Sequence, residues 1–285
     1  MLYDLFDKAI VSVLPKVNYY RSFAKIVKKD RIDKVSKGIN LSEPAKQYLS
    51  KRENDSAFNA YWDVLAQYCL IHADVFGQEI NSKNTRGAVA EVGRIFQWVK
   101  AADDLVDESP GLRPKNLIAL DNLVRGAREP IIPAENFVKE TYDSFNNSTK
   151  DILARIYEEE MSQHTGDDNE HYLHRGDEGY LFGQLEFKIL KEFMPDFPGK
   201  TEEFFALSGK AATYFDDFKD FDLDRRNGCG YKNPDMRLVL LSSYLKIACD
   251  RFIHLSASEK PKHFAFLVLG GLYQLRELIG IQERT

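Results

Sequence analysis

Two clusters of aspartates, each at the end of a predicted helix, constrain this 285-residue chain more than any other feature. The first contains Asp103, Asp104, Asp107 and Glu108 and ends a segment with helical spacing of apolar residues from about Thr85. A helix C-terminus carries partial negative charge, so each acid there costs about 0.3–1 kcal/mol. Such a cluster fits either a solvated helix end or a cation site, and oxygen ligands without His or Cys suit Mg²⁺.

The second cluster contains five aspartates within nine residues: Asp216, Asp217, Asp220, Asp222 and Asp224. It ends another predicted helix, which runs from about residue 201 to residue 227. Asp216, Asp220 and Asp224 are spaced by four residues and therefore share one helix face. Two clusters that both oppose the dipole of their helix favour a metal site over a solvated surface.

The two clusters resemble the metal-binding motifs of class I isoprenoid synthases. The first resembles the aspartate-rich DDxxD motif of that superfamily. The second has the spacing of the second metal motif of class I terpene synthases, with Asp at each ligand position. It also contains the DDxxD string of trans-prenyltransferases, at Asp216, Asp217 and Asp220. The metal ligands that the resemblance implies are Asp103, Asp104, Asp107, Asp216, Asp217, Asp220 and Asp224.

A third string, Arg175-x-x-Glu178-Gly179, lies between the two clusters. It resembles the diphosphate sensor, linker and effector of bacterial terpene synthases, which makes these three residues the expected catalytic group. Arg175 is expected to bind the substrate diphosphate as well. The C-terminal Arg-Tyr pair of that family is missing, and the nearest candidates, Tyr273 and Arg276, do not match it.

The resemblance implies an all-α fold, the isoprenoid synthase fold, in which a single domain of residues 1–285 forms a bundle of about ten helices around a central cavity. It implies a bacterial-type terpene cyclase. Such an enzyme uses three Mg²⁺ ions to ionise a linear C15 or C20 prenyl diphosphate, releases diphosphate and cyclises the cation.

The substrate is expected to contact apolar walls and basic side chains. Aromatic residues could shelter a cation through their ring faces, although ordinary core packing explains them equally well. The expected wall residues are Phe58, Trp62, Phe96 and Val99. The expected diphosphate contacts after the second cluster are Arg225, Arg226 and Lys232, where the two arginines could instead offset the neighbouring acids.

Helical periodicity is also predicted from Glu178 to Phe193, from about Pro234, and in a short segment from Asn116 to Arg125. Gly179 and Gly183 fall inside the first of these ranges. Each Gly costs about 1 kcal/mol against Ala in a helix, which indicates a break, a ligand close to the backbone, or tight helix packing.

The amino-acid composition limits the classes of binding partner and the cellular compartment that we expect. The net charge of −5 argues against a nucleic-acid-binding protein. Three cysteines without CxxC spacing predict a reducing cytoplasm. The longest apolar run, residues 264–272, is too short for a transmembrane segment, and no targeting segment is expected. The oligomeric state stays open, with a homodimer among the states that the sequence allows.

Several alternatives share these motifs. A chain-elongating prenyltransferase would need a basic diphosphate site before the first cluster, where only Arg86 and Arg94 are suitable. A head-to-head synthase of the squalene or phytoene type has a first motif similar to residues 99–108. A non-catalytic helical protein could bind Ca²⁺ or basic partners. A zinc site at His164, His171 and His174 has irregular spacing and no nearby Cys.

Overall fold

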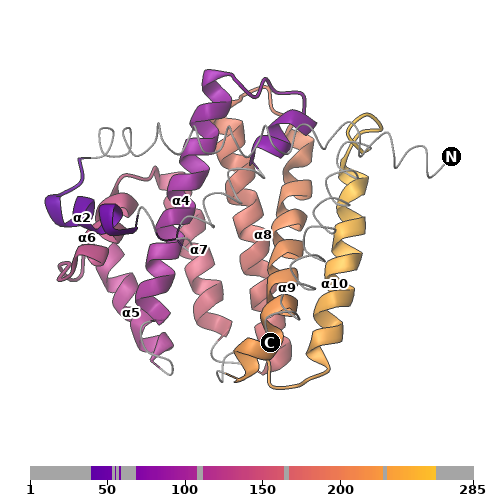
Figure 1. Ribbon diagram of the computed structural model, residues 1–285. Coiled ribbons are helices and arrows are strands. Elements are labelled where there is room, and N and C mark those ends of the chain that lie inside the picture. Colours follow the sequence, from indigo (N-terminus) through magenta and orange to yellow (C-terminus); the bar gives the residue numbers. More distant parts are fainter. Residues whose placement is uncertain are drawn as a thin grey trace.

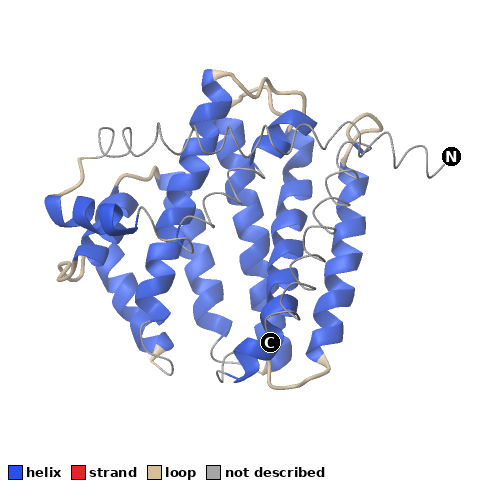
Figure 2. Ribbon diagram, in the orientation of Figure 1, coloured by secondary structure: helices blue, strands red, loops and turns tan. Residues whose placement is uncertain are grey.

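The computed structural model describes residues 40–52, 55, 58, 69–107, 112–163, 167–226 and 230–260. Within these ranges every regular element is an α-helix or a short 3₁₀ helix, so the predicted all-α class is confirmed (Figure 2). The α-helices are α2 (Glu43–Arg52), α4 (Lys83–Asp107), α5 (Arg113–Val124), α6 (Pro133–Asp143), α7 (Asn147–Gln163), α8 (Asp168–Phe193), α9 (Glu202–Arg226) and α10 (Met236–Asp250). The 3₁₀ helices are η1 (Gly199–Thr201) and η2 (Arg251–His254).

The long helices α4, α7, α8, α9 and α10 stand side by side (Figure 1). The shorter helices α2, α5 and α6 pack on the α4 side of this row. No helix in the described part of the chain is both long enough and apolar enough to cross a membrane.

Side-chain caps set several helix starts. The Ser82 hydroxyl accepts a hydrogen bond from the Thr85 amide (3.0 Å) at the start of α4, and the Asn146 side chain accepts one from the Thr149 amide (2.8 Å) at the start of α7. Asp167 caps α8 by accepting from two backbone amides. The helix therefore begins at Asp168, well before the predicted Glu178. Similarly, α5 begins at Arg113, with a proline in its first turn.

The α8–α9 pair is in backbone contact along a row of glycines. A Cβ built on Gly183 would lie 2.1 Å from the Phe205 carbonyl oxygen, and one on Gly179 would lie 2.8 Å from the Gly209 carbonyl oxygen. Because α8 continues without interruption through both glycines, the helix break, one of the three alternatives for these glycines, is wrong. The glycines are explained by tight packing against α9.

An aromatic cluster fills the end of the bundle at which α9 begins. Phe204 and Phe205, in the first turn of α9, contact Phe76 with ring centroids 5.8 Å apart in both pairs. Phe197 joins the cluster at 5.1 Å from Phe76. The acid cluster of α9 lies at the other end of the same helix, so the two ends of the bundle differ sharply in polarity.

Candidate functional site

The residues of the two acid clusters and of the Arg175 string lie at one end of the bundle. Helices α4, α7 and α9 end there and α8 begins there, at the lower end of the view in Figure 1. The topology therefore brings together motifs that are far apart in the sequence.

The first cluster is paired with cations of the protein itself. The Lys100 ammonium lies 2.6 Å from the Asp104 carboxylate and 3.4 Å from that of Asp103. Arg52 also donates a hydrogen bond to Asp104. Burial raises the pKa of Asp103, and the nearby charge of Asp107 raises it further. The carboxylates of this cluster are thus balanced by cationic side chains of the protein, and burial acts mainly on Asp103.

Arg113, the first residue of α5, joins this cluster to α7. It donates a hydrogen bond to Asp107 and lies 3.7 Å from the Asp103 carboxylate. Two of its nitrogens also contact one Glu160 oxygen, Nη2 at 2.8 Å and Nε at 3.0 Å, and Nη2 is the nitrogen that faces Asp103. The Glu160 side chain is only 13% exposed, so this ion pair is partly shielded from water.

Arg175, on α8, pairs with carboxylates from two helices. It lies 2.7 Å from Glu178 and 3.0 Å from Asp217, whose side chain is 11% exposed. Burial disfavours its charge, but these carboxylates outweigh that effect and raise the pKa of Arg175. The Gln163 amide donates to Glu178 (2.8 Å) and the Tyr231 hydroxyl donates to Asp217 (3.1 Å). Arg175 is therefore held in one position from both sides.

Glu160 connects the two halves of the site. It interacts electrostatically with Asp103 on the α4 side and with both Arg175 and Glu178 on the α8 side. A chain of alternating charges thus runs from the first cluster through Arg113 and Glu160 to Arg175 and on to Asp217. We call these residues, with Asp103, Asp107 and Glu178, the charged network.

The rest of the second cluster is more exposed. Lys219 lies 3.1 Å from Asp216 and 3.2 Å from Asp220. Burial raises the pKa of Asp224, and the charges of Asp220, Asp217 and Asp216 raise it further.

Gly179, the expected effector residue, lies at the contact of α8 with α9. A Cβ there would meet the Thr213 hydroxyl at 2.3 Å. This contact accounts for the glycine without a ligand.

The expected wall residues that the structure describes are in the apolar core. Phe96 is buried and packs against Phe182 of α8 with ring centroids 5.5 Å apart. Val99 packs at the edge of the same core, and Phe58 contacts Tyr48 of α2. Trp62 lies outside the described residues, as do Tyr273 and Arg276. The central cavity stays a prediction.

The basic residues after the second cluster lie at the surface. Arg225, Arg226 and Lys232 are exposed, and Arg226 donates to the backbone oxygen of Asp222 (3.0 Å). Arg237 lies 2.8 Å from the carboxylate of Asp222. Arg237 therefore offsets a neighbouring acid, one of the two roles weighed for the basic residues of this segment.

The histidines point to separate partners. The His174 ring contacts Glu159 (2.7 Å), whereas His171 contacts the backbone oxygen of Gln163 (3.3 Å) and packs edge-on against Tyr231. Burial lowers the pKa of His171. His164 lies outside the described residues.

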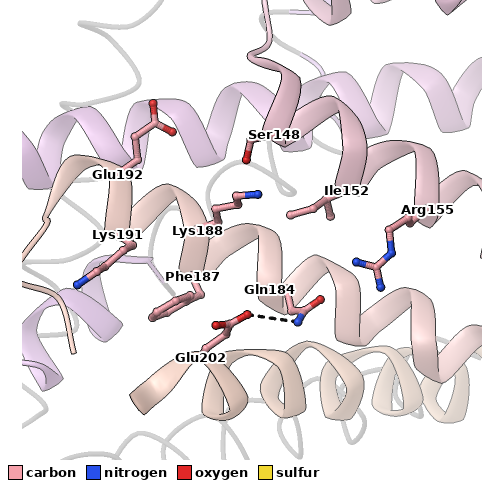
Figure 3. Close-up of a pocket in the computed structure, with 9 residues that line it drawn as sticks. All are labelled: Ser148, Ile152, Arg155, Gln184, Phe187, Lys188, Lys191, Glu192 and Glu202. Atoms are coloured by element: carbon pink, nitrogen blue, oxygen red, sulfur yellow. Dashed lines mark hydrogen bonds between the residues drawn. The ribbon is translucent and has the colours of Figure 1, made fainter. Parts of the chain in front are cut away.

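A pocket of about 490 Å³ lies on a different face, between α7 and α8 and beside the start of α9. The Lys188 ammonium and the Arg155 guanidinium point toward its centre, and Gln184 is hydrogen-bonded to Glu202 at its edge (Figure 3). None of the predicted site residues lines this pocket.

Metal binding at the acid clusters would need side chains to exchange partners. In the described ranges no three His, Cys, Asp or Glu side chains converge in the geometry of a metal site. The donors are nevertheless all oxygens, which is the ligand chemistry that Mg²⁺ prefers. A bound ion would have to displace Arg52, Lys100, Arg113 and Lys219 from the carboxylates that they contact.

Sequence patterns alone did not identify Arg113, Glu160 or Tyr231 as members of the site. The available signal was weak: an arginine closely following an acid cluster, and a glutamate one turn from the end of its helix. Comparison with protein families, curated proteins and solved structures gives no match for this chain. The resemblance to isoprenoid synthases therefore depends on the motifs themselves.

Proposed function

We propose that this protein is a class I terpene synthase with the isoprenoid synthase fold. It would use Mg²⁺ to ionise a linear C15 or C20 prenyl diphosphate and would cyclise the resulting carbocation with release of diphosphate. The observation that carries the proposal is the charged network, because it links the first acid cluster to Asp217 through the predicted diphosphate sensor, Arg175.

We assign the acidic residues to metal binding and the basic residues to substrate binding. Asp103, Asp104 and Asp107 would hold two ions, and the second cluster, through Asp216, Asp220 and Asp224, would hold a third. Bound Mg²⁺ supplies the positive charge that neutralises diphosphate as it leaves. A trianionic leaving group needs several fixed cations, which is why the acids and the arginine must share one end of the bundle.

Arg175 would donate hydrogen bonds to the diphosphate oxygens. Its guanidinium is already fixed by Glu178 and Asp217 at 2.7 and 3.0 Å. The side chain would therefore lose little conformational entropy when the diphosphate leaves. A preorganised donor of this kind stabilises developing charge without reorganising. Aromatic rings of the adjoining core, such as Phe96 and Phe182, would exclude water and face the allylic cation.

The test is to incubate the purified protein with C10, C15 and C20 prenyl diphosphates and Mg²⁺, each with and without isopentenyl diphosphate, and to analyse the products by mass spectrometry. A cyclic hydrocarbon or alcohol from one substrate supports the proposal. Asp103→Ala and Asp216→Ala should abolish turnover with unchanged helix content. Asp121→Ala, at a surface ion pair on α5, is the matched control and should stay active. Activity of either cluster variant would contradict the assignment.

A head-to-head synthase is the second candidate. The observation in its favour is that Tyr231, in the Gly-x-Gly-Tyr segment similar to that family's sequence after its second motif, donates to Asp217. The same assay separates the two functions, because a head-to-head synthase joins two prenyl chains and doubles the carbon number. A longer diphosphate formed only with isopentenyl diphosphate would instead identify a chain-elongating prenyltransferase.

A further inference from the structure

The pocket between α7 and α8 is built from one face of each helix. Its lining residues on each helix are three or four positions apart, and residues at that spacing share a helix face. They include Ser148, Ile152 and Arg155 on α7 and Gln184, Lys188 and Lys191 on α8. The volume of about 490 Å³ is that of a small-molecule site.

Two cations of this pocket have no partner in the described part of the protein. Neither the Arg155 guanidinium nor the Lys188 ammonium forms an ion pair or a side-chain hydrogen bond with a described residue. Both side chains are exposed and point toward the centre of the pocket (Figure 3). An anion that entered the pocket would therefore meet two positive charges from two different helices.

The other charged groups of the pocket are engaged elsewhere. The Lys191 ammonium donates to backbone oxygens just beyond the end of α8, one of them that of Phe197 (2.6 Å). The carboxylates of Glu192 and Glu202 each accept a hydrogen bond from a side-chain amide, at 3.2 and 3.3 Å. None of the three pairs with Arg155 or Lys188, so an incoming anion would not have to break an ion pair.

The lining chemistry selects a phosphate ester among anions. Arginine binds phosphate oxygens in a bidentate manner, and lysine adds a compact charge. The Ser148 oxygen faces the same hollow (Figure 3) and can donate a further hydrogen bond. A phosphate monoester carries a charge of about −1.5 to −2 at pH 7, which matches two cations better than a singly charged carboxylate. The side chains of Ile152 and Phe187, each 7% exposed, offer apolar contact to the organic group of the ester.

We propose that this pocket is a binding site for a small, soluble phosphate monoester. Its phosphate is held by Arg155, Lys188 and Ser148, and its apolar group packs on Ile152 and Phe187. The site is independent of the proposed function, because no residue of the charged network lines the pocket.

The test is a calorimetric titration with phenyl phosphate, in the absence of divalent ions, of the wild type, Arg155→Gln and Lys188→Gln. Lys115→Gln is the matched control, because Lys115 is exposed on α5, does not line the pocket, and loses the same charge. Each pocket variant should bind phenyl phosphate about tenfold more weakly than the control, as expected for loss of a charged hydrogen-bond donor. Inorganic phosphate, which lacks the apolar group, and benzoate, which carries one charge, should both bind the wild type more weakly than phenyl phosphate.

Nuclear magnetic resonance locates the bound probe. The methyl signals of Ile152, assigned by their loss in Ile152→Val, should shift when phenyl phosphate is added. Those of Ile118, which is 51% exposed on α5, should not. Because Arg155 and Lys188 are exposed, their variants should fold, and melting curves check this for each protein.

Absence of binding to the wild type at millimolar phenyl phosphate would overturn the proposal, as would equal binding by both pocket variants and Lys115→Gln. Binding without a shift of the Ile152 signals would place the anion elsewhere and overturn it too. Benzoate binding as tight as that of phenyl phosphate would overturn the choice of a phosphate ester. Asp103→Ala should bind phenyl phosphate like the wild type, so this site and the proposed function can fail separately.

Discussion

Gly183→Ala perturbs the α8–α9 contact at a place where no side chain can move aside. The added Cβ would lie 2.1 Å from the carbonyl oxygen and 2.6 Å from the carbonyl carbon of Phe205, and 2.7 Å from the Cα of Ala206. All three are backbone atoms of α9. To restore an ordinary contact of 3.4 Å, one helix must shift by about 1.3 Å, the difference between 3.4 and 2.1 Å.

The expected effect combines two opposing terms. Alanine is better than glycine inside a helix by about 1 kcal/mol. Overpacking in a well-packed interior typically costs about 1–3 kcal/mol, and the upper value applies here because the obstacle is backbone. We therefore expect Gly183→Ala to lower the free energy of unfolding by about 2 kcal/mol.

Urea unfolding followed by circular dichroism at 222 nm measures this difference as a shift of the midpoint. Gly199→Ala is the matched control, because a Cβ at that position has no atom within 4 Å. It should be as stable as the wild type within about 0.5 kcal/mol. If Gly183→Ala matched the control or exceeded it, the backbone contact between α8 and α9 would be wrong.

Three further outcomes are expected. Trp98→Phe should lower the free energy of unfolding by about 1–3 kcal/mol in urea titrations, because the buried Val138 carbonyl loses its 2.9 Å hydrogen bond; a neutral effect would contradict the α4–α6 contact. Asp217→Asn should destabilise by about 2 kcal/mol, whereas Asp222→Asn, at a 64% exposed side chain, should change stability by less than 1 kcal/mol; equal effects would show that Arg175 is not held as described. The raised pKa of Asp103 means that its ionised form opposes folding, so stability from this group is present at low pH and is lost as pH rises through the raised pKa. Without Mg²⁺, Asp103→Asn should therefore melt at or above the wild-type temperature at pH 7, with a smaller advantage near pH 4, and a lower melting temperature at pH 7 would contradict this.

The helix boundaries that depend on local chemistry could be predicted from the sequence. The starts of α4 and α9 agree with expectation, because caps and apolar spacing act within a few residues. The start of α8 could not be predicted in the same way, since Gly176 and Gly179 argue against a helix unless a closely packed partner helix is known. That partner is α9, more than 25 residues further along the chain.

The residues of the candidate site likewise include some that local sequence patterns predict and some that they do not. Its acids and Arg175 were identified because they form short strings with recognisable spacing. Arg113 and Glu160 are 47 residues apart, and no periodicity connects them. Their pairing depends on how α5 and α7 pack, which tertiary contacts decide. Tyr231 could not be predicted for the same reason, because its contact with Asp217 depends on how the chain folds after α9.

The glycines between α8 and α9 are required by the fold, whereas the aspartates are not, so the two sets of residues can change independently among related sequences. Gly179, Gly183 and Gly209 leave no room for even a methyl group, so any descendant with this helix pair must keep glycine at these positions, whatever it does. Helix packing does not require the aspartates in the same way. A homologue that retained the glycines and replaced the aspartates would be expected to keep this helix pair and to lack the proposed activity.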